Sequence, residues 1–455
     1  MLEPLYTAEE MRAAEAAYPG SDDELMDRAG RAVAAEVLRR WPDAERVVAV
    51  CGSGKNGGDG RVAVEALREA GKDAEVADDP VGADVVIDAL FGTGFHGEPR
   101  PEAASKIAAI NTAPAPVVSV DIASGVDAST GEVVGEAVEA DVSVTFHARK
   151  VGHEVAPGRF HADEVAVADI GLEPVATRHA VATKEILGIV PRRSPGDTKY
   201  TAGHVVVVGG SRGMTGAPSL SALAALRADA GYVTLAGPAS AVPVFETWLL
   251  EAVKRPLSED GGGLLAPDAA AEVLELVGKA GALAIGPGLG RSDGTREVVR
   301  RVLAAAKVPV VVDGDALFGL EPDDWPAPRV LTPHSGELAR LLGVEAAWVD
   351  AHRLAALERA VERFRCIVLL KGDGTLVSEP GSGAIVCGGD PALATAGTGD
   401  VLTGIVAAFL AKGVEPRLAA AAAAVAHTEA ARSAPARTGL IASDLLDVIP
   451  RILSE

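Results

Sequence analysis

In the stretch ATAGTGDVLTG, residues 394–404, a glycine-rich turn runs directly into an apolar helix that we predict over 401–411. Gly397 and Gly399 allow a tight turn with unpaired backbone N–H groups, and the first helical turn adds more donors and a positive dipole end. Such a turn favours an anion, for example the oxygens of a phosphate group. Asp400 lies in this positive region. We therefore expect its carboxylate to be ionised and to act as a base toward a hydroxyl that attacks a phosphate.

A short glycine turn followed by aspartate is more commonly an ordinary helix cap, so its meaning depends on the rest of the chain. Upstream, apolar segments predicted as buried strands are each followed by a glycine-rich or polar loop. Ligands of open α/β sheets bind where the carboxyl ends of the strands meet. We therefore predict that these loops form one site. The loops are GGSRGMTGA (209–217), GPGLG (286–290), TPHSGE (332–337) and KGDGT (371–375).

The first half of the chain has a second series of such loops. They are GSGKNGGDG (52–60), ALFGTGFHGE (89–98), DIASGVD (121–127) and HARKVGH (147–153). The first loop contains GxGxxG with Asp78 or Asp79 about 20 residues later, a spacing also found in dinucleotide-binding oxidoreductases. That motif alone is weak evidence, and no site for a hydride acceptor is recognisable. We predict a second ligand site at this sheet edge.

Composition limits the classes of protein to consider. A chain of 455 residues is expected to form two or three domains, and Pro174, Pro191, Pro195 and Gly196 mark a boundary region. The formal net charge of −22 argues against nucleic acid or an anionic membrane as a partner. The three cysteines, Cys51, Cys366 and Cys387, are too scattered to indicate disulfides or a zinc site.

No targeting segment or membrane span is predicted. The first residues, MLEPLYTAEE, have neither a basic region nor an apolar core, as a signal peptide would. The most apolar tract, 401–426, is interrupted by Lys412, Glu415 and Arg417, which favours two buried helices. We therefore expect a cytoplasmic protein.

The second half offers residue types that phosphoryl transfer needs. Glu337 is the best candidate to hold Mg²⁺, through water molecules, because Mg²⁺ keeps most of its hydration shell. His334 lies three residues earlier and is either a ligand-binding residue or a helix-entry histidine bonded to backbone. Asp313 and Asp315 are interpreted as turn residues stabilised by local side-chain bonds. The segment 371–375 could hold a nucleotide, although no Walker A loop is present.

Together, these motifs resemble two known enzyme families. GGSRGMTGA, GPGLG, TPHSGE, KGDGT and ALATAGTGDVLTG resemble the ADP-dependent NAD(P)H-hydrate dehydratases, whereas the loops of the first half resemble those of the NAD(P)H-hydrate epimerases. The order of the two resembles the bifunctional nicotinamide nucleotide repair enzymes. The resemblance implies an α/β fold, with a Rossmann-like three-layer domain over 1–180 followed by a ribokinase-like α/β domain over 181–455.

For the first domain the resemblance implies epimerisation of the R and S hydrates of NADH and NADPH. Asp121 is the candidate acid/base and Lys150 a weaker partner. Asn56, Asp88 and Ser124 match a potassium site, although Ala123 stands where proline is commoner. Further substrate contacts besides Asp121 are implied for Lys55, Asn56, Gly57, Gly58, Asp59, Gly92, Thr93, Gly94, Phe95, His96, Gly97 and Glu98.

For the second domain the resemblance implies dehydration of the S hydrate with ADP as co-substrate. Asp400 would deprotonate the ring hydroxyl, and the products would be NAD(P)H, AMP and phosphate. Asp390 stands where asparagine is usual and would add negative charge near phosphate unless it is neutralised. Ala217, Gly288, His334 and Asp400 match hydrate-binding positions, and Lys371, Gly372, Asp373, Gly374, Thr375 and Gly399 match the nucleotide site.

Two alternatives come from other classes of protein. One is a ribokinase-like kinase of small molecules with a non-catalytic first domain, which shares the turn at 397–400. The other is a non-enzymatic binding module. Polar residues at the predicted strand ends, such as Asn56, Asp88 and Asp121, favour an enzyme. We also expect the protein to be a homo-oligomer.

Overall fold

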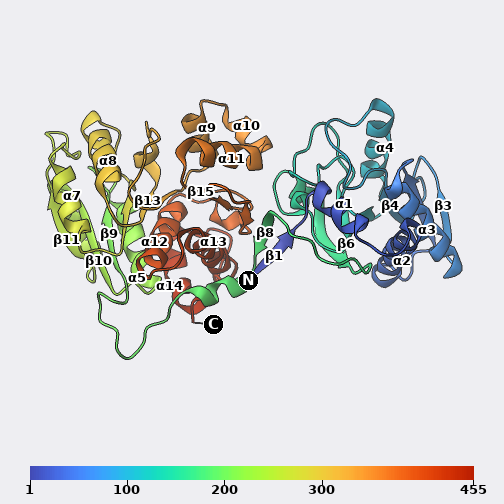
Figure 1. Ribbon diagram of the computed structural model, residues 1–455, viewed down its shortest axis with the longest axis horizontal. Helices are drawn as coiled ribbons and strands as arrows, with labels where there is room; N and C mark the ends of the chain where they lie inside the picture. The colour runs from blue at the N-terminus through green and yellow to red at the C-terminus, as the bar shows by residue number, and fades with distance from the viewer. Residues whose placement is uncertain (455) are drawn as a thin grey trace. The chain divides into compact units, whose positions relative to one another are not determined.

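The structure is a computed structural model that describes residues 1–454, and the chain divides into two compact units. The N-terminal unit consists of Pro4–Ala180 and Asp350–Leu354. The C-terminal unit consists of Met1–Glu3, Val181–Val349 and Ala355–Glu455. Each unit contains its own sheet and is described separately (Figure 1).

The sheet of the N-terminal unit has six parallel strands in the order β3-β2-β4-β5-β6-β7. Its central strands are nearly continuous apolar runs, as expected when both faces of a parallel sheet are covered. The strands are β2 (Arg46–Cys51), β3 (Asp73–Val76), β4 (Val85–Ala89), β5 (Val117–Val120), β6 (Ala140–Phe146) and β7 (Ala162–Ala168).

Helices cover both faces of this sheet, which makes three layers. Val47 and Ala49 of β2 pack toward α2 (Asp22–Arg40) and α3 (Lys55–Glu69), whereas Val50 packs toward α4 (Pro101–Thr112). This alternation follows from the period of two residues in a strand. The expected three-layer architecture is therefore confirmed. The remaining elements are α1 (Ala8–Ala16), η1 (Val151–His153) and η2 (Gly158–His161).

The sheet of the C-terminal unit follows the order β1-β8-β17-β16-β15-β14-β13-β12-β9-β10-β11. Neighbouring strands from β15 through β11 in this order are parallel, whereas β16 is antiparallel to both β15 and β17. The strands are β1 (Leu2–Leu5), β8 (His179–Ala182), β9 (His204–Val208), β10 (Tyr232–Pro238), β11 (Val253–Leu257), β12 (Ala282–Ile285), β13 (Val310–Val312), β14 (Arg329–Leu331), β15 (Ile367–Leu370), β16 (Leu376–Ser378) and β17 (Ile385–Val386).

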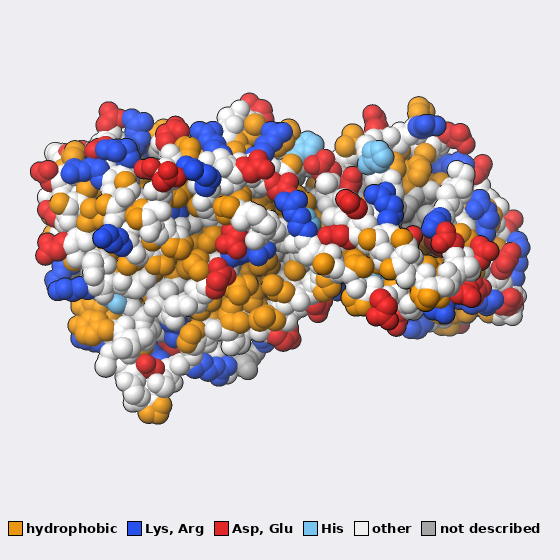
Figure 2. All heavy atoms as spheres, viewed as in Figure 1, with side chains coloured by type: hydrophobic (Ala, Val, Ile, Leu, Met, Phe, Trp, Pro, Cys, Tyr) orange, Lys and Arg blue, Asp and Glu red, His pale blue; other side chains and the backbone are white. Residues whose placement is uncertain are grey.

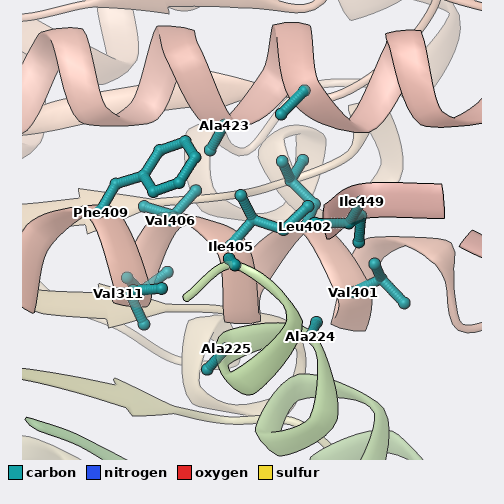
Figure 3. Packing of buried hydrophobic residues seen from close by; sticks show 14 of the residues in the cluster. Ala224, Ala225, Val311, Val401, Leu402, Ile405, Val406, Phe409, Ala423 and Ile449 are labelled. Atoms are coloured by element: carbon teal, nitrogen blue, oxygen red, sulfur yellow. The ribbon is translucent and has the colours of Figure 1, made fainter. Parts of the chain in front are cut away.

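The core of this unit surrounds α12 (Thr398–Ala411), which is buried along most of its length. Figure 3 shows side chains of α12 meeting those of α5 (Gly216–Arg227), α13 (Pro416–Arg432) and α14 (Ala442–Ile452). Helix α13 is buried on all sides over its alanine run 419–424, because a methyl group lets neighbouring elements approach closely. The other helices are α6 (Val242–Trp248), α7 (Ala269–Val277), α8 (Asp293–Ala305), α9 (Ser335–Leu342), α10 (Ala346–Ala351), α11 (Arg353–Phe364), η3 (Lys184–Ile189), η4 (Ala239–Ala241), η5 (Gly314–Leu317) and η6 (Pro391–Leu393).

Each sheet has a topological switch point, where the chain changes the direction in which it adds strands. In the N-terminal unit β2 lies between β3 and β4, so the chain reverses there. In the C-terminal unit β9 lies between β10 and β12. Loops that follow the two strands at such a point diverge and leave a crevice at the carboxyl edge of the sheet. We therefore expect a ligand site at each of these two switch points.

In the face shown in Figure 2, acidic and basic side chains are interspersed, and no broad basic area is visible. No helix within residues 1–454 is long and apolar enough to cross a membrane.

Candidate active sites

The crevice at the switch point of the N-terminal unit is a cavity of about 1020 Å³. It is lined by the loop after β2, by the loop after β4, and by Asp121 at the end of β5. Asp121 has a backbone φ of 66°, which is uncommon for a residue with a side chain. Strained backbone of this kind is concentrated at functional sites.

Asp121 is held ionised by a buried lysine. The ammonium of Lys150 lies 2.6 Å from Asp121 Oδ1, and Thr145 Oγ1 donates to the same oxygen at 3.0 Å. Burial alone would raise the pKa of Asp121, but the charge of Lys150 outweighs it, and the pKa lies below its ordinary value. His153 donates from Nε2 to Asp121 O at 3.0 Å and accepts from Lys150 N at Nδ1. Its pKa is lowered to about 3, mainly by burial, so it is neutral.

Asp59 is another of the carboxyl groups on the wall of this cavity. Burial raises the pKa of Asp59 to about 8, and the negative charges of Asp121 and Glu15 add to the increase. At neutral pH Asp59 is therefore largely protonated while Asp121 is ionised. Such a divergence of two pKa values is the arrangement that acid and base catalysis require.

Oxygen atoms from three elements meet beside the cavity at Asp88. Ser124 donates to the fully buried carboxylate of Asp88 through Oγ (2.6 Å) and through its backbone N–H (2.9 Å). Asn56 Nδ2 donates to Phe91 O at 2.9 Å, and a Cβ at Gly92 would lie 2.7 Å from Asn56 Oδ1. Asp88 has only neutral donors and no ion pair in the described part of the chain. A buried carboxylate among oxygen ligands suits a monovalent cation, so these residues fit potassium.

Most predicted substrate contacts lie on the wall of the cavity, but some do not. Lys55 is at its rim and pairs with Asp22 at 3.0 Å and Glu15 at 3.4 Å. Lys150 is fully buried outside the cavity wall. Gly57, Gly58, Gly97, Asp88 and Ser124 are also absent from the wall, whereas Lys55, Asn56, Asp59, Gly92, Thr93, Gly94, Phe95, His96, Glu98 and Asp121 line it.

At the switch point of the C-terminal unit, the loops after β9 and β12 touch each other. Ser211 Oγ donates to Gly288 O at 2.9 Å, and a Cβ at Gly288 would lie 2.4 Å from Met214 O. Gly288 has a φ of 64°, a conformation that favours glycine, and the close approach of Met214 also leaves no room for a side chain there. Ala217 follows in the first turn of α5, and Ser221 of this helix donates to Asp400 O at 2.8 Å. The predicted hydrate-binding loops therefore lie against the start of α12.

The expectation that Asp400 is fully ionised is wrong. Burial raises the pKa of Asp400 to about 7, and the negative charge of Asp313 is the next cause. The helix dipole favours the carboxylate by only about 1 kcal/mol, less than burial near other carboxylates costs. Asp400 is therefore half protonated near neutral pH, which suits a general base.

The interpretation of Asp313 and Asp315 as locally bonded turn residues is also wrong. Asp313 is buried and accepts from Lys371 Nζ (2.8 Å), Thr332 Oγ1 (2.8 Å) and Thr403 Oγ1 (2.7 Å). Asp315 accepts from Gly290 N at 2.9 Å and Arg291 Nε at 2.8 Å. These partners come from other parts of the chain, so the sequence around 313–315 could not indicate them.

The predicted nucleotide loop lies beside α12. A Cβ at Gly399 would be 3.3 Å from Lys371 Nζ, so this ammonium lies close against the first turn of the helix. Thr375 N donates to Gly388 O at 3.0 Å, and a Cβ at Gly389 would lie 2.6 Å from Asp373 Oδ1. The loop 372–375 is thus packed against residues 388–389. Lys371, the first turn of α12 and this loop form one edge of the site.

Glu337 and His334 form a capping box at the start of α9. Glu337 Oε2 accepts from His334 N at 2.9 Å and lies 3.8 Å from Lys371 Nζ, while His334 Nδ1 accepts from Gly336 N. No group of three or more His, Cys, Asp or Glu side chains gathers as a metal cluster within residues 1–454. One carboxylate is nevertheless enough for Mg²⁺, which is commonly held by substrate phosphates and water. Glu337 therefore fits magnesium as a single carboxylate.

Asp390 does not add an uncompensated charge. Arg437 Nη2 donates to Asp390 Oδ2 at 2.8 Å, and Ala392 N donates to Oδ1 at 2.9 Å. Arg437 lies in the loop between α13 and α14, beyond the reach of any local sequence pattern. The pair neutralises the aspartate that replaces the usual asparagine.

Comparisons with known proteins agree with this arrangement. A family model described as NAD(P)H-hydrate dehydratase matches residues 205–452, and one described as YjeF-related protein N-terminus matches 22–81 and 72–152. The bifunctional NAD(P)H-hydrate repair enzyme Nnr of Moorella thermoacetica is 36% identical over 99% of this chain and 96% of its own length. Its namesake in Escherichia coli is 34% identical over 95% of this chain and 89% of its length.

The chain belongs to the family of bifunctional NAD(P)H-hydrate repair enzymes.

Solved structures support the fold of the C-terminal unit. An ADP/ATP-dependent NAD(P)H-hydrate dehydratase from Bacillus subtilis, co-crystallised with ATP/Mg²⁺, matches with a TM-score of 0.54 and 27% identity. The match covers 60% of this family member and 97% of the Bacillus chain. A ribokinase-like superfamily protein from Enterococcus faecalis matches with a TM-score of 0.53 at 24% identity, which bears on fold alone. The expected ribokinase-like fold is confirmed.

Proposed function

We propose that this chain repairs hydrated NADH and NADPH as both an isomerase and a lyase. Residues 1–180 form the epimerase, which interconverts the R and S hydrates, and residues 181–455 form the ADP-dependent dehydratase. The observation that supports this most strongly is the pair of sites at two switch points, each with a carboxyl group whose pKa is shifted toward neutrality. Cytoplasmic location and assembly as a homo-oligomer belong to the same proposal.

In the epimerase, Asp59 and Asp121 have complementary roles. The hydrate has a hydroxyl group on the ring carbon next to the ring nitrogen. Asp121, ionised by Lys150, takes the hydroxyl proton, while the carbon–nitrogen bond breaks and its electron pair stays on nitrogen. Asp59, protonated at neutral pH, donates a proton to that nitrogen. The open form then has an aldehyde, and closure on its other face by the reverse steps inverts the centre.

Lys150 positions the base and does not transfer the proton itself. Its ammonium donates to Thr145 Oγ1 (2.8 Å), Phe146 O (2.9 Å) and Ala148 O (3.2 Å) and pairs with Asp121. All of its protons are thus directed at protein atoms, and the side chain is fully buried.

In the dehydratase, Asp400 acts on the hydroxyl of the S hydrate. It takes the proton, and the oxygen attacks the terminal phosphorus of ADP, which breaks the phosphoanhydride bond and releases AMP. The ring nitrogen's lone pair then expels phosphate, and loss of a neighbouring proton restores NAD(P)H. Lys371 and the N–H groups of the first α12 turn bind the phosphate oxygens. Ala217, Gly288 and His334 contact the hydrate, and Gly372, Asp373, Gly374, Thr375 and Gly399 the nucleotide.

Two metal ions belong to the proposal. Asn56, Asp88 and Ser124 would hold potassium, which neutralises the buried carboxylate beside the epimerase cavity and fixes the loops around it. Glu337 would hold Mg²⁺ through water, where the ion neutralises phosphate charge in the dehydratase. The pairing of Asp390 with Arg437 removes the conflict with phosphate that the sequence suggested.

The test uses a mixture of R and S hydrates of NADPH, with and without ADP and Mg²⁺, and follows the return of dihydronicotinamide absorbance. We expect complete ADP-dependent recovery by the wild-type protein. The variant Asp121→Asn should stop when the S form is spent, and Asp400→Asn should give no recovery. Absence of recovery by the wild type, or recovery without a nucleotide, would contradict the proposal. Phosphorylation of an alcohol in place of recovery would favour a kinase.

A further inference from the structure

Asp313 stands at the centre of the dehydratase site although it lies outside every predicted binding loop. It follows β13 and has a side chain that is only 3% exposed. Oδ1 accepts from Lys371 and Thr332, and Oδ2 accepts from Thr403. Lys371 follows β15, Thr332 follows β14 and Thr403 belongs to α12. One carboxylate therefore ties together three elements that border the reacting atoms.

The bonds of Asp313 determine where Lys371 lies. The ammonium of Lys371 is 2.8 Å from Asp313 and lies so close to Gly399 that a Cβ there would be 3.3 Å away. Thr403 is one helical turn beyond Asp400, so the two side chains are on the same side of α12. The bond from Thr403 to Asp313 thus fixes the rotation of the helix that presents Asp400.

Asp313 also dominates the charges near Asp400. Burial is the largest reason for the raised pKa of Asp400; the negative charge of Asp313 is next, and Glu337 and Asp315 add smaller contributions. Lys371 acts in the opposite direction. His427 of α13 is another titratable group near this turn, and burial lowers its pKa to about 4, so it is neutral.

We propose that Asp313 is a positioning residue for the dehydratase: it fixes Lys371 beside the first turn of α12 and strengthens Asp400 as a base through its negative charge. The inference rests on the proposed dehydratase function. Asp313 makes no contact with the reacting groups itself. It acts through Lys371, Thr403 and the electrostatic field at Asp400.

The variant Asp313→Asn tests this through the pH dependence of kcat/KM for ADP-dependent dehydration of the S hydrate. The wild type should lose activity as the pH falls through about 7, where Asp400 becomes protonated. In the variant the negative charge that opposes ionisation of Asp400 is gone while the positive charge of Lys371 remains, so this acidic limb should move down by about one pH unit or more. A limb that stays in place while activity persists would show that Asp313 is merely structural.

Two controls accompany this variant. Asp315→Asn makes the same change two residues later, where the carboxylate is paired with Arg291, and should move the limb several-fold less. Thr403→Val removes one hydrogen bond to Asp313 but leaves its charge, so the limb should stay near that of the wild type. Equal shifts in Asp313→Asn and Asp315→Asn would overturn the proposal.

A measurement on the wild type covers the case in which Asp313→Asn does not fold. The carboxyl carbon of Asp400 is titrated by ¹³C NMR and identified by the signal missing from Asp400→Asn. We expect a midpoint of about 7. A midpoint near the ordinary value of aspartate would overturn the electrostatic role. This titration needs no turnover and therefore tests the role of Asp313 separately. Failure of the proposed function itself would instead appear as absence of hydrate conversion by the wild type.

Discussion

Asp59 differs from its neighbours on the cavity wall in its protonation. Its carboxyl group has a pKa of about 8, so it can donate a proton at neutral pH, whereas Asp121 is ionised. The pattern GSGKNGGDG indicated a ligand-binding loop but gave no sign of this acid. The shift comes from burial and from the charges of Asp121 and Glu15, which come from distant parts of the chain.

We predict that Asp59→Asn slows epimerisation by about 100-fold or more, since general acid catalysis contributes this much. In the wild type the rate should fall as the pH rises through about 8, because Asp59 then loses its proton. The measurement is conversion of purified R hydrate, coupled to excess dehydratase activity. Asp22→Asn, at the rim of the same cavity, is the control and should retain the alkaline limb. Unchanged epimerisation in Asp59→Asn would exclude it as the acid.

Asp88 leads to a prediction about stability. Burial raises the pKa of Asp88, so the folded state binds its proton more tightly than the unfolded state. Without a cation, its contribution to stability is therefore present at low pH and lost as the pH rises. We predict that potassium raises the unfolding temperature of the N-terminal unit, more so at higher pH, relative to tetramethylammonium chloride. Asp88→Asn should lose this dependence, and a response to potassium in that variant would place the ion elsewhere.

Among the elements, the contact between α12 and α5 contributes both to the stability of the C-terminal unit and to the position of the catalytic residue. A Cβ at Gly404 would lie 2.2 Å from Ser221 O and 2.8 Å from the Cβ of Ala224. Helix α5 also holds Asp400 O through Ser221. The close approach of the two helices is therefore needed to place the base.

We predict that Gly404→Ala destabilises the C-terminal unit by about 1–3 kcal/mol, the usual cost of overpacking. Dehydratase activity should fall as well, because α12 must shift away from α5. Thermal unfolding and ADP-dependent recovery of absorbance provide the two readouts. Gly188→Ala, at a helical position with nothing within 4 Å of the added Cβ, is the control and should unfold like the wild type. An equally stable Gly404→Ala variant would contradict the described packing.

Sequence patterns predicted some elements better than others for physical reasons. The apolar runs of β2 (Arg46–Cys51) and β9 (His204–Val208) can be recognised in the sequence as buried strands, because central parallel strands are buried on both faces. Strand β11, with the sequence VKRPL, was not predicted, since an edge strand tolerates charges and proline. The interpretation of Asp313 failed because its partners Lys371 and Thr403 lie 58 and 90 residues away.

At the scale of the whole molecule, two compact units with separate cores lead us to expect separate responses to ligands. ADP with Mg²⁺ should stabilise only the C-terminal unit, by about 2.7 kcal/mol at 100 times its dissociation constant. Calorimetric unfolding should therefore show two transitions, one that shifts with ADP and one that shifts with potassium. AMP without Mg²⁺ is the control and should shift the ADP-sensitive transition less. A single transition moved by both ligands would show that the units unfold together.

The alanine run of α13 limits how this gene can change. Residues 419–424 are fully or almost fully buried, in a helix that has no exposed side there. Every single-base change that alters an alanine codon yields Val, Gly, Thr, Ser, Pro, Asp or Glu. All of these have lower helix propensity than alanine, and all but glycine are also larger. In a library of point mutants, these six adjacent codons should therefore be among the least tolerant positions, although none of them belongs to the proposed sites.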